Sequence, residues 1–392
     1  MPARCRSSPL PWSPSRRRSP EPDPAPDAAE ERLDRIPCSQ CGAELTYAPG
    51  TRMVRCAYCG HEQPITGSPW QVVVERDLAA ALAKAADEHL TEDRRILKCQ
   101  TCAASFDAAE GQGAGHCPFC GSAIVADPAR TRRIRPDGVV PFAIPRDKAQ
   151  DALRQWLAGL WFAPSDLSRR AEAEARIEGL YLPFWTYDCD TTTEYQGARG
   201  LRVVRHVPVT RQVQGRLVTR MQPVTELRWT PVAGRVARHF DDVLVPAARA
   251  LPLQDLGRAG AWNTQSVRAY APDWLAGFRS ALYDVPLADG FAAAQAIMRG
   301  VIESDIRHDI GGDAQRITAS RTTWRGASFK HVLLPVWVAA YRYRGRTFRF
   351  VVNGQTGQAH GERPWSVGKI AFAVLAAFLV AAALALAAAR IG

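Results

Sequence analysis

Eight of the ten cysteines in this 392-residue chain form four C-x-x-C pairs, a spacing that is typical of metal ligands. The pairs are Cys38/Cys41, Cys56/Cys59, Cys99/Cys102 and Cys117/Cys120. The second quartet repeats the first at an offset of 61 residues, and 14 residues separate the two pairs within each quartet. Four thiolates at about 2.3 Å complete the tetrahedral shell of a structural Zn²⁺ and leave no position for a substrate. The sequence therefore predicts two zinc ions in two closed ribbons.

The residues that follow the pairs favour zinc knuckles. Glycine follows three pairs, at Gly42, Gly60 and Gly121, where a left-handed backbone turns amide N–H groups toward the sulfurs. Ala103 occupies the fourth such position, where an L-residue costs about 1–2 kcal/mol. A disulfide framework and a rubredoxin-like iron site are the alternatives. A metal is favoured over disulfides because nothing in the sequence directs the chain out of the cytosol. Zinc is favoured over iron as the metal for such a site.

Four further residues could be mistaken for ligands. His61 and His116 lie next to the quartets, but each quartet is already full, so we expect them to face solvent or to support the ligands. Cys5 and Cys189 have no C-x-x-C partner and are expected to bind no metal.

The elements that hold the cysteines belong to an expected α+β fold with six segments. These are a disordered Pro/Arg-rich tail (1–35), zinc ribbon 1 (36–64), a helical linker (65–96), zinc ribbon 2 (97–125), an α+β body (126–365) and a transmembrane helix (370–389). The tail carries eight prolines and five arginines within its first 27 residues, a composition that cannot bury enough apolar surface to fold.

The body contains an apparent internal repeat, at about 137–200 and 283–358. A Val-Pro pair, a helix-forming stretch and an L-P-x-W motif occur in the same order in both parts. The L-P-x-W motifs are 182–185 and 334–337. Each part is predicted to be a helix followed by an antiparallel hairpin, with turns at Tyr195-Gln196-Gly197 and Tyr343-Arg344-Gly345.

The C-terminal segment predicts a membrane anchor. Residues 370–389 contain no charged or polar side chain, and 20 helical residues at 1.5 Å each span the roughly 30 Å core of a bilayer. Arg363 and Lys369 before this segment place the preceding chain in the cytoplasm. We therefore expect a single-pass protein of the inner membrane. A buried Ala-rich helix is the alternative.

Alanines along this helix could also mediate self-association. They recur every fourth residue, at Ala373, Ala377, Ala381, Ala385 and Ala389. Such a column of small side chains lets two helices approach closely in lipid.

The net charge of +11 is concentrated in the body. Residues 201–250 carry +6 and residues 321–369 carry +8, whereas the remainder is −3. A protein that binds nucleic acid should carry basic residues on the domain that contacts the phosphates. The ribbons are close to neutral and do not fit this expectation. Basic strands near a bilayer are more simply explained by the anionic lipids of the inner leaflet. A solvated basic face is the remaining interpretation.

Motifs for catalysis are absent from the sequence. It has no G-x-x-x-x-G-K-[ST], H-E-x-x-H, G-x-S-x-G or G-x-G-x-x-G. Pairs such as Asp188/Asp190 and Asp241/Asp242 are more typical of turns and strand edges than of acid/base couples. We therefore predict no enzymatic activity.

Several motifs together resemble a known bacterial family. They are Cys56-Ala57-Tyr58-Cys59-Gly60, Cys117-Pro118-Phe119-Cys120-Gly121 and the stretches 181–188, 240–245, 333–337 and 352–357. The family carries transcription factor IIB-type zinc ribbons and is often labelled "primosomal protein N′ (replication factor Y), superfamily II helicase". The resemblance implies zinc at the eight cysteines, a membrane helix in some members, and association with phage-shock-type membrane proteins. A helicase needs a phosphate-binding loop, and this sequence has none, so the helicase label is not supported.

These observations favour a membrane-anchored adaptor whose ribbons recruit protein partners to the cytoplasmic face of the membrane. Nucleic-acid binding in replication or transcription is the alternative function. An enzyme that uses a cleft in the body is a third.

Overall fold

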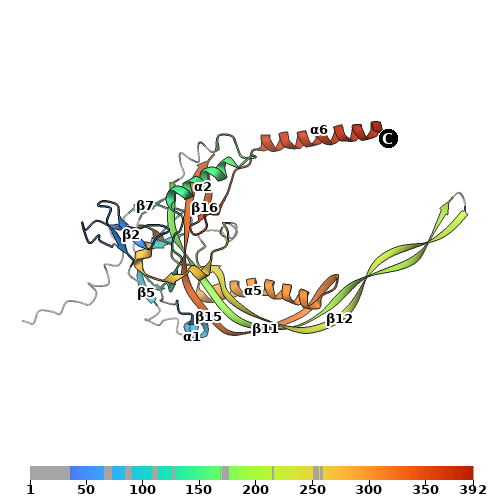
Figure 1. Cartoon of the computed structure of the whole chain (residues 1–392), viewed down its shortest axis with the longest axis horizontal. Coiled ribbons are helices and arrows are strands. Elements are labelled where there is room, and N and C mark those ends of the chain that lie inside the picture. Colours follow the sequence, from blue (N-terminus) through green and yellow to red (C-terminus); the bar gives the residue numbers. More distant parts are fainter. Residues whose placement is uncertain are drawn as a thin grey trace, which may run out of the picture.

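The computed structural model is organised around one long, curved sheet, with two cysteine-rich modules at one end and a separate C-terminal helix (Figure 1). The structure describes residues 36–65, 73–83, 91–107, 114–125, 129–167, 169, 176–213, 216–249, 256 and 259–391. The tail predicted to be disordered, 1–35, lies outside these residues. The fold is mixed α+β and consists mostly of strands.

The central sheet has nine strands among the described residues, and three long ones form its spine in the order β12–β11–β15. Beyond β15 the order continues to β10 and β13. Of the remaining strands, β14 pairs with β11, both β4 and β16 pair with β15, and β17 pairs with β16. The strands are β4 (Arg76–Asp77), β10 (Gly138–Val139), β11 (Arg176–Val213), β12 (Arg216–Pro246), β13 (Arg268–Ala269), β14 (Arg279–Ser280), β15 (Ala314–Tyr343), β16 (Arg346–Asn353) and β17 (Ala359–Gly361).

The two L-P-x-W motifs meet in the middle of this sheet. β11 and β15 are antiparallel, with Leu182 opposite Leu334 and Pro183 opposite Leu333. Because side chains alternate along a strand, Leu333 and Trp337 enter the core on one face, whereas Leu182 and Leu334 enter the core on the other. The sheet is therefore covered on both faces at this point.

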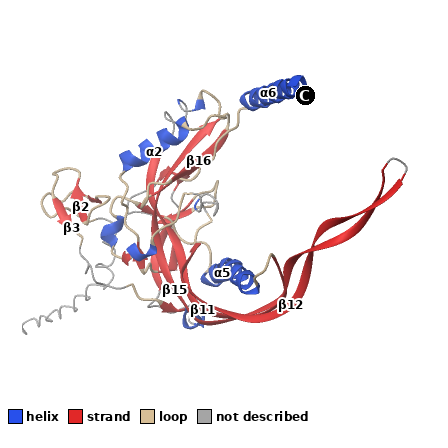
Figure 2. Ribbon diagram, turned by 45° about the vertical axis from the view of Figure 1, so that its right-hand side comes forward, coloured by secondary structure: helices blue, strands red, loops and turns tan. Residues whose placement is uncertain are grey.

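Two helices cover the sheet. α2 (Arg146–Ala158) packs through Ala149, Leu153 and Leu157. α5 (Leu287–Ile310) lies on the concave side of the curved strands (Figure 2). Its buried stripe has a residue at every fourth position: Ala294, Met298, Ile302, Ile306 and Ile310. Two short 3₁₀ helices, η3 (Thr264–Ser266) and η4 (Pro272–Leu275), lie in the connection before α5.

The order helix, long strand, hairpin partner occurs twice, as α2–β11–β12 and α5–β15–β16. The turn predicted at Tyr343-Arg344-Gly345 is confirmed, because β15 ends at Tyr343 and β16 begins at Arg346. Arg344 and Gly345 have φ angles of 49° and 79°, as a tight turn between antiparallel strands requires.

The turn predicted at Tyr195-Gln196-Gly197 is wrong. These residues lie inside β11, which pairs with β12 on one side and β15 on the other and continues to Val213. The register against β15 shifts between Gln196 and Gly197, and a Cβ at position 197 would collide with the carbonyl oxygen of Arg316. The glycine therefore marks an irregularity where two strands approach closely, which has the same local sequence signal as a turn.

Two tryptophans connect the two parts of the body. Trp185 Nε1 donates to the carbonyl of Val285 (3.0 Å), two residues before α5 begins. Trp337 Nε1 donates to the carbonyl of Ile144 (2.9 Å), two residues before α2 begins. Each part thus fixes the start of the helix of the other part. The internal duplication itself stays a prediction.

The cysteine-rich modules are small sheets. Ribbon 1 (residues 36–64) contains β1 (Leu45–Tyr47), β2 (Met53–Cys56) and β3 (Glu62–Pro64). Ribbon 2 (residues 97–125) contains the end of β5 (Thr91–Lys98), β6 (Ser105–Asp107), β7 (Ala114–His116) and β8 (Ala123–Val125), and β9 (Ala129–Ile134) pairs with β5. Between the ribbons, the predicted helical linker contains β4 and a six-residue helix, α1 (Leu78–Ala83), and its last residues belong to β5.

Two elements extend from the body. The first is the end of the β11–β12 hairpin, which pairs with no third strand beyond Gly200, the last residue of β11 opposite β15. The second is α6 (Val367–Ile391), which contains the predicted transmembrane segment. Both leave the body toward the same side, and β2 of ribbon 1 lies at the opposite side (Figures 1 and 2).

Candidate metal centres

The structure brings each predicted cysteine quartet together. In ribbon 1, Cys38 Sγ lies 3.6 Å from Cys59 Sγ, and Cys41 Sγ lies 3.5 Å from Cys56 Sγ. All four Sγ atoms lie within 4.8 Å of one another. Four sulfurs at about 2.3 Å from one tetrahedral ion would be about 3.8 Å apart. The quartet therefore fits a tetrahedral Zn²⁺.

Ribbon 2 has the same arrangement. Cys99 Sγ lies 3.6 Å from Cys120 Sγ, and Cys102 Sγ lies 3.5 Å from Cys117 Sγ. Each of the two clusters can hold one zinc ion, with four thiolates and no open coordination position.

The knuckle backbone is the same after all four pairs. The N–H of Gly42 donates to the carbonyl of Cys38 (2.8 Å), and the equivalent residues Gly60, Ala103 and Gly121 make the same bond at 2.8–3.0 Å. All four have positive φ, between 59° and 75°. Ala103 thus adopts the left-handed conformation predicted from its position, with the strain that a Cβ brings there.

Backbone N–H groups stabilise one thiolate in each quartet. The N–H groups of Cys59 and Tyr58 lower the pKa of Cys56 to about 6. Burial acts to raise the pKa of Cys99, but the N–H groups of Cys102 and Thr101 outweigh it and lower the pKa to about 7. Burial contributes to raising the pKa of other thiols in the quartets, such as Cys102, and a bound Zn²⁺ would deprotonate all four thiols of a quartet outright.

Ribbon 1 is fastened to the body through β1. The hydroxyl of Tyr47 donates to the carbonyl of Phe142 (3.1 Å), and its N–H donates to the carbonyl of Ala276 (2.9 Å). Its ring packs against Trp274 at a centroid distance of 5.3 Å. The Cys56–Cys59 knuckle does not take part in this contact, and Tyr58 within it is 86% exposed.

Ribbon 2 is fastened through its knuckle. Phe119, between Cys117 and Cys120, is fully buried and stacks on Phe106 at a centroid distance of 5.4 Å. The guanidinium of Arg349 donates through Nε to the carbonyl of Phe119 (3.1 Å). The knuckle therefore forms part of the core that covers one face of the central sheet.

The remaining candidate ligands contact protein groups. His61 Nε2 lies 3.2 Å from Ser39 Oγ and links the two knuckles of ribbon 1. His116 is exposed, and its backbone carbonyl rather than its side chain accepts from Arg279 Nη1 (3.1 Å). Cys189 is buried in the body, where burial raises the pKa of its thiol, and Cys5 lies outside the described residues.

Sequence reasoning missed a charged cluster in the body. Lys330 Nζ lies 2.7 Å from Asp242 Oδ1, 3.1 Å from Glu75 Oε1 and 3.7 Å from Asp188 Oδ2. Burial raises the pKa of Asp188 to about 6. With Asp241, these carboxylates could resemble a metal site, but the ammonium group already supplies the cation. These residues are far apart in the chain, so no local sequence pattern indicates that they form a cluster.

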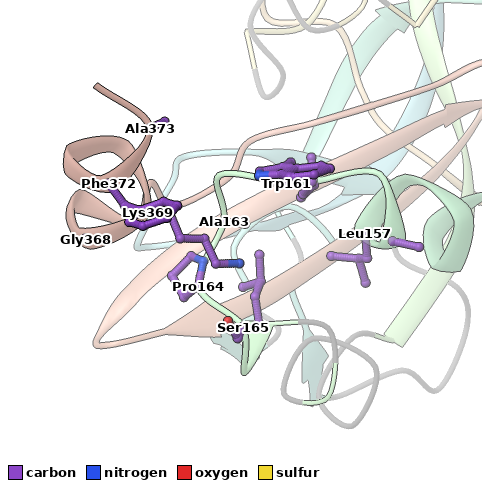
Figure 3. A pocket seen from close by; sticks show the side chains of 12 residues that line it. Leu157, Trp161, Ala163, Pro164, Ser165, Gly368, Lys369, Phe372 and Ala373 are labelled. Atoms are coloured by element: carbon purple, nitrogen blue, oxygen red, sulfur yellow. The ribbon is translucent and has the colours of Figure 1, made fainter. Parts of the chain in front are cut away.

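α6 contains a 19-residue stretch, Val367–Ala385, that is long and apolar enough to cross a membrane and is not buried against the body. An open groove of about 730 Å³ separates its first turn from the C-terminal end of α2. Figure 3 shows Trp161, Lys369 and Phe372 around this groove.

Comparison with known proteins supports the metal centres. A family model described as LSD1 zinc finger matches residues 38–61, which run from the first ligand of ribbon 1 to His61. Together with the Cys₄ cluster, this match indicates a zinc ribbon. The transcription factor IIB-type family stays an expectation.

A similar protein exists over nearly the whole chain. The uncharacterized protein YdjG of Bacillus subtilis (strain 168) is 23% identical over 335 residues, which cover 85% of this chain and 91% of YdjG. The similarity thus covers most of both chains. No solved structure matches the chain.

Proposed function

We propose that this chain is an adaptor that α6 anchors in a membrane and that presents ribbon 1 to a protein partner. The observation that carries the proposal is the exposed knuckle of ribbon 1. Tyr58 is 86% exposed, and aromatic side chains of this kind are frequent anchors in protein interfaces. A closed Cys₄ site supplies a rigid platform rather than chemistry.

The surroundings of α6 support the anchor. Trp161 and Trp365 are exposed beside its first turn, and Lys369 lies within that turn. Aromatic and basic side chains gather at membrane–water interfaces in this way. Arg363 and Lys369 favour a cytoplasmic body by the same rule. The column from Ala373 to Ala389 stays our proposal for self-association or for a partner helix.

Two experiments on the full chain test this proposal. A photo-crosslinking amino acid at Tyr58 should capture a discrete protein in native membranes, and the same group at Thr101, in the first knuckle of ribbon 2, should not. Truncation before Lys369 should move the protein into the soluble fraction after carbonate extraction. Equal crosslinking at both positions, or a truncated chain that stays in the membrane at high salt, would contradict the adaptor.

Nucleic-acid binding is a second candidate, favoured by the arginines on the free hairpin. If it is correct, the affinity for duplex DNA should fall steeply with salt, and the slope should depend on those arginines. Weak binding by the full chain at physiological salt would exclude this function.

A further inference from the structure

The β11–β12 hairpin extends far beyond the body. We call residues 201–213 and 216–229 the arm. At its root, Trp229 lies against Gly200 and under the guanidinium of Arg316, 4.7 Å from the ring centroid. From there the two strands pair only with each other, over 13 residues of β11 or about 44 Å. An isolated two-stranded hairpin is marginally stable in water, so a surface that binds this arm would stabilise it.

The arm carries most of its arginines on one face and exposed apolar side chains on both faces. Arg205 pairs with Val224 and Arg211 with Val218, so odd-numbered residues of β11 share a face with even-numbered residues of β12. The first face carries the exposed side chains of Arg205, Arg211, Arg220 and Arg228, together with the exposed apolar side chains of Leu201 and Val224. The opposite face carries the exposed apolar side chains of Val204, Leu217, Met221 and Leu227. Leu217 is 76% exposed and Met221 60%.

Charge limits what can bind the arm. Its sequence contains six arginines and one acidic residue, Glu226, which already pairs with Arg205 (3.4 Å). A second copy of the arm would be repelled by this charge. A nucleic acid would neutralise the arginines but leave the exposed apolar side chains in water. The interface of an anionic bilayer satisfies the first face, because phosphates bind its guanidinium groups and its apolar side chains enter the boundary of the acyl chains.

The arm and α6 leave the body toward the same side (Figures 1 and 2). We propose that the arm is a hairpin whose mixed arginine and apolar face binds anionic phospholipid at the surface of the bilayer that α6 spans. This proposal rests on the membrane anchoring proposed above.

Hydrogen exchange of the full chain in nanodiscs tests the proposal. One set of nanodiscs contains phosphatidylcholine alone, and the other also contains phosphatidylglycerol. Each arginine near an anionic surface adds roughly fivefold to lipid affinity. Exchange in peptides from the arm should therefore slow by about tenfold or more in the anionic discs, while ribbon 1 is unchanged.

A matched pair of variants makes the test specific. Arg205→Gln/Arg211→Gln/Arg220→Gln should abolish the slowing in anionic discs. The control Arg52→Gln/Lys148→Gln/Arg307→Gln removes the same charge from exposed positions outside the arm. In this control, exchange of the arm should still slow in anionic discs. In lipid-free detergent, arm peptides of both variants should exchange like the wild type, which shows that the hairpin remains paired.

Other outcomes would show whether the arm proposal or the proposed function is wrong. If α6 integrates but the arm exchanges equally fast in both lipids, the arm proposal is overturned and the anchor stands. If the chain does not integrate, the proposed function itself fails. Equal slowing in both lipids would overturn anionic recognition. Slowing that requires added DNA, or two copies in one disc, would assign the arm to nucleic acid or to self-association instead.

Discussion

Ribbon 1 and ribbon 2 have the same cysteine spacing and the same knuckle backbone, but they attach to the body through different parts. Their offset of 61 residues makes Tyr58 and Phe119 equivalent. Tyr58 is exposed, whereas Phe119 is fully buried against the sheet. A repeated metal site therefore does not imply a repeated role. The knuckle of ribbon 2 packs inward and completes the core, whereas the knuckle of ribbon 1 is exposed.

The largest contrast is expected from the equivalent cysteines of the two ribbons. Cys56→Ser and Cys117→Ser should each remove one of two zinc ions, as metal analysis would show. Cys117→Ser should also lower the free energy of unfolding of the body by about 3 kcal/mol or more, because Phe106 and Phe119 lose their packing. Cys56→Ser should loosen the free knuckle alone. Equal exchange protection of residues 180–184 in both variants would contradict this contrast.

Much of this comparison cannot be seen in the sequence. The quartets and the apolar segment are local patterns, so spacing and length alone predicted them. The inward orientation of Phe119 depends on Arg349, which lies 230 residues away. The turn at Gly197 was predicted wrongly for a similar reason. Only the pairing with distant strands distinguishes a strand irregularity from a turn. The free arm likewise follows from where β15 begins.

The contacts that fasten the two ribbons should differ in strength. Arg349→Met removes a charge-assisted hydrogen bond to the carbonyl of Phe119 and should cost about 2 kcal/mol. Tyr47→Phe should cost about 1 kcal/mol, because the carbonyl of Phe142 still accepts from the N–H of Gly50. Urea denaturation of zinc-loaded protein measures both. A larger loss for Tyr47→Phe would mean that ribbon 1 is the more firmly fastened.

The smallest expected difference concerns one knuckle residue. Ala103→Gly should stabilise ribbon 2 by about 1 kcal/mol, because glycine relieves the left-handed strain. The equivalent Gly42→Ala should destabilise ribbon 1 by a similar amount through conformation alone, since a Cβ there meets nothing within 4 Å. Zinc release to a chelator, followed separately for each ribbon, should become slower in the first variant and faster in the second. Changes of the same sign would contradict the shared knuckle geometry.

The most direct test of the two roles compares Tyr58→Ala with Phe119→Ala in the zinc-loaded full chain. Phe119→Ala should lower the free energy of unfolding by about 3–5 kcal/mol, because it opens a cavity beneath ribbon 2. Tyr58→Ala should change it by less than about 0.5 kcal/mol, as an exposed side chain does. Similar losses of stability in both variants would contradict the account that ribbon 2 fastens the body while ribbon 1 is presented to a partner.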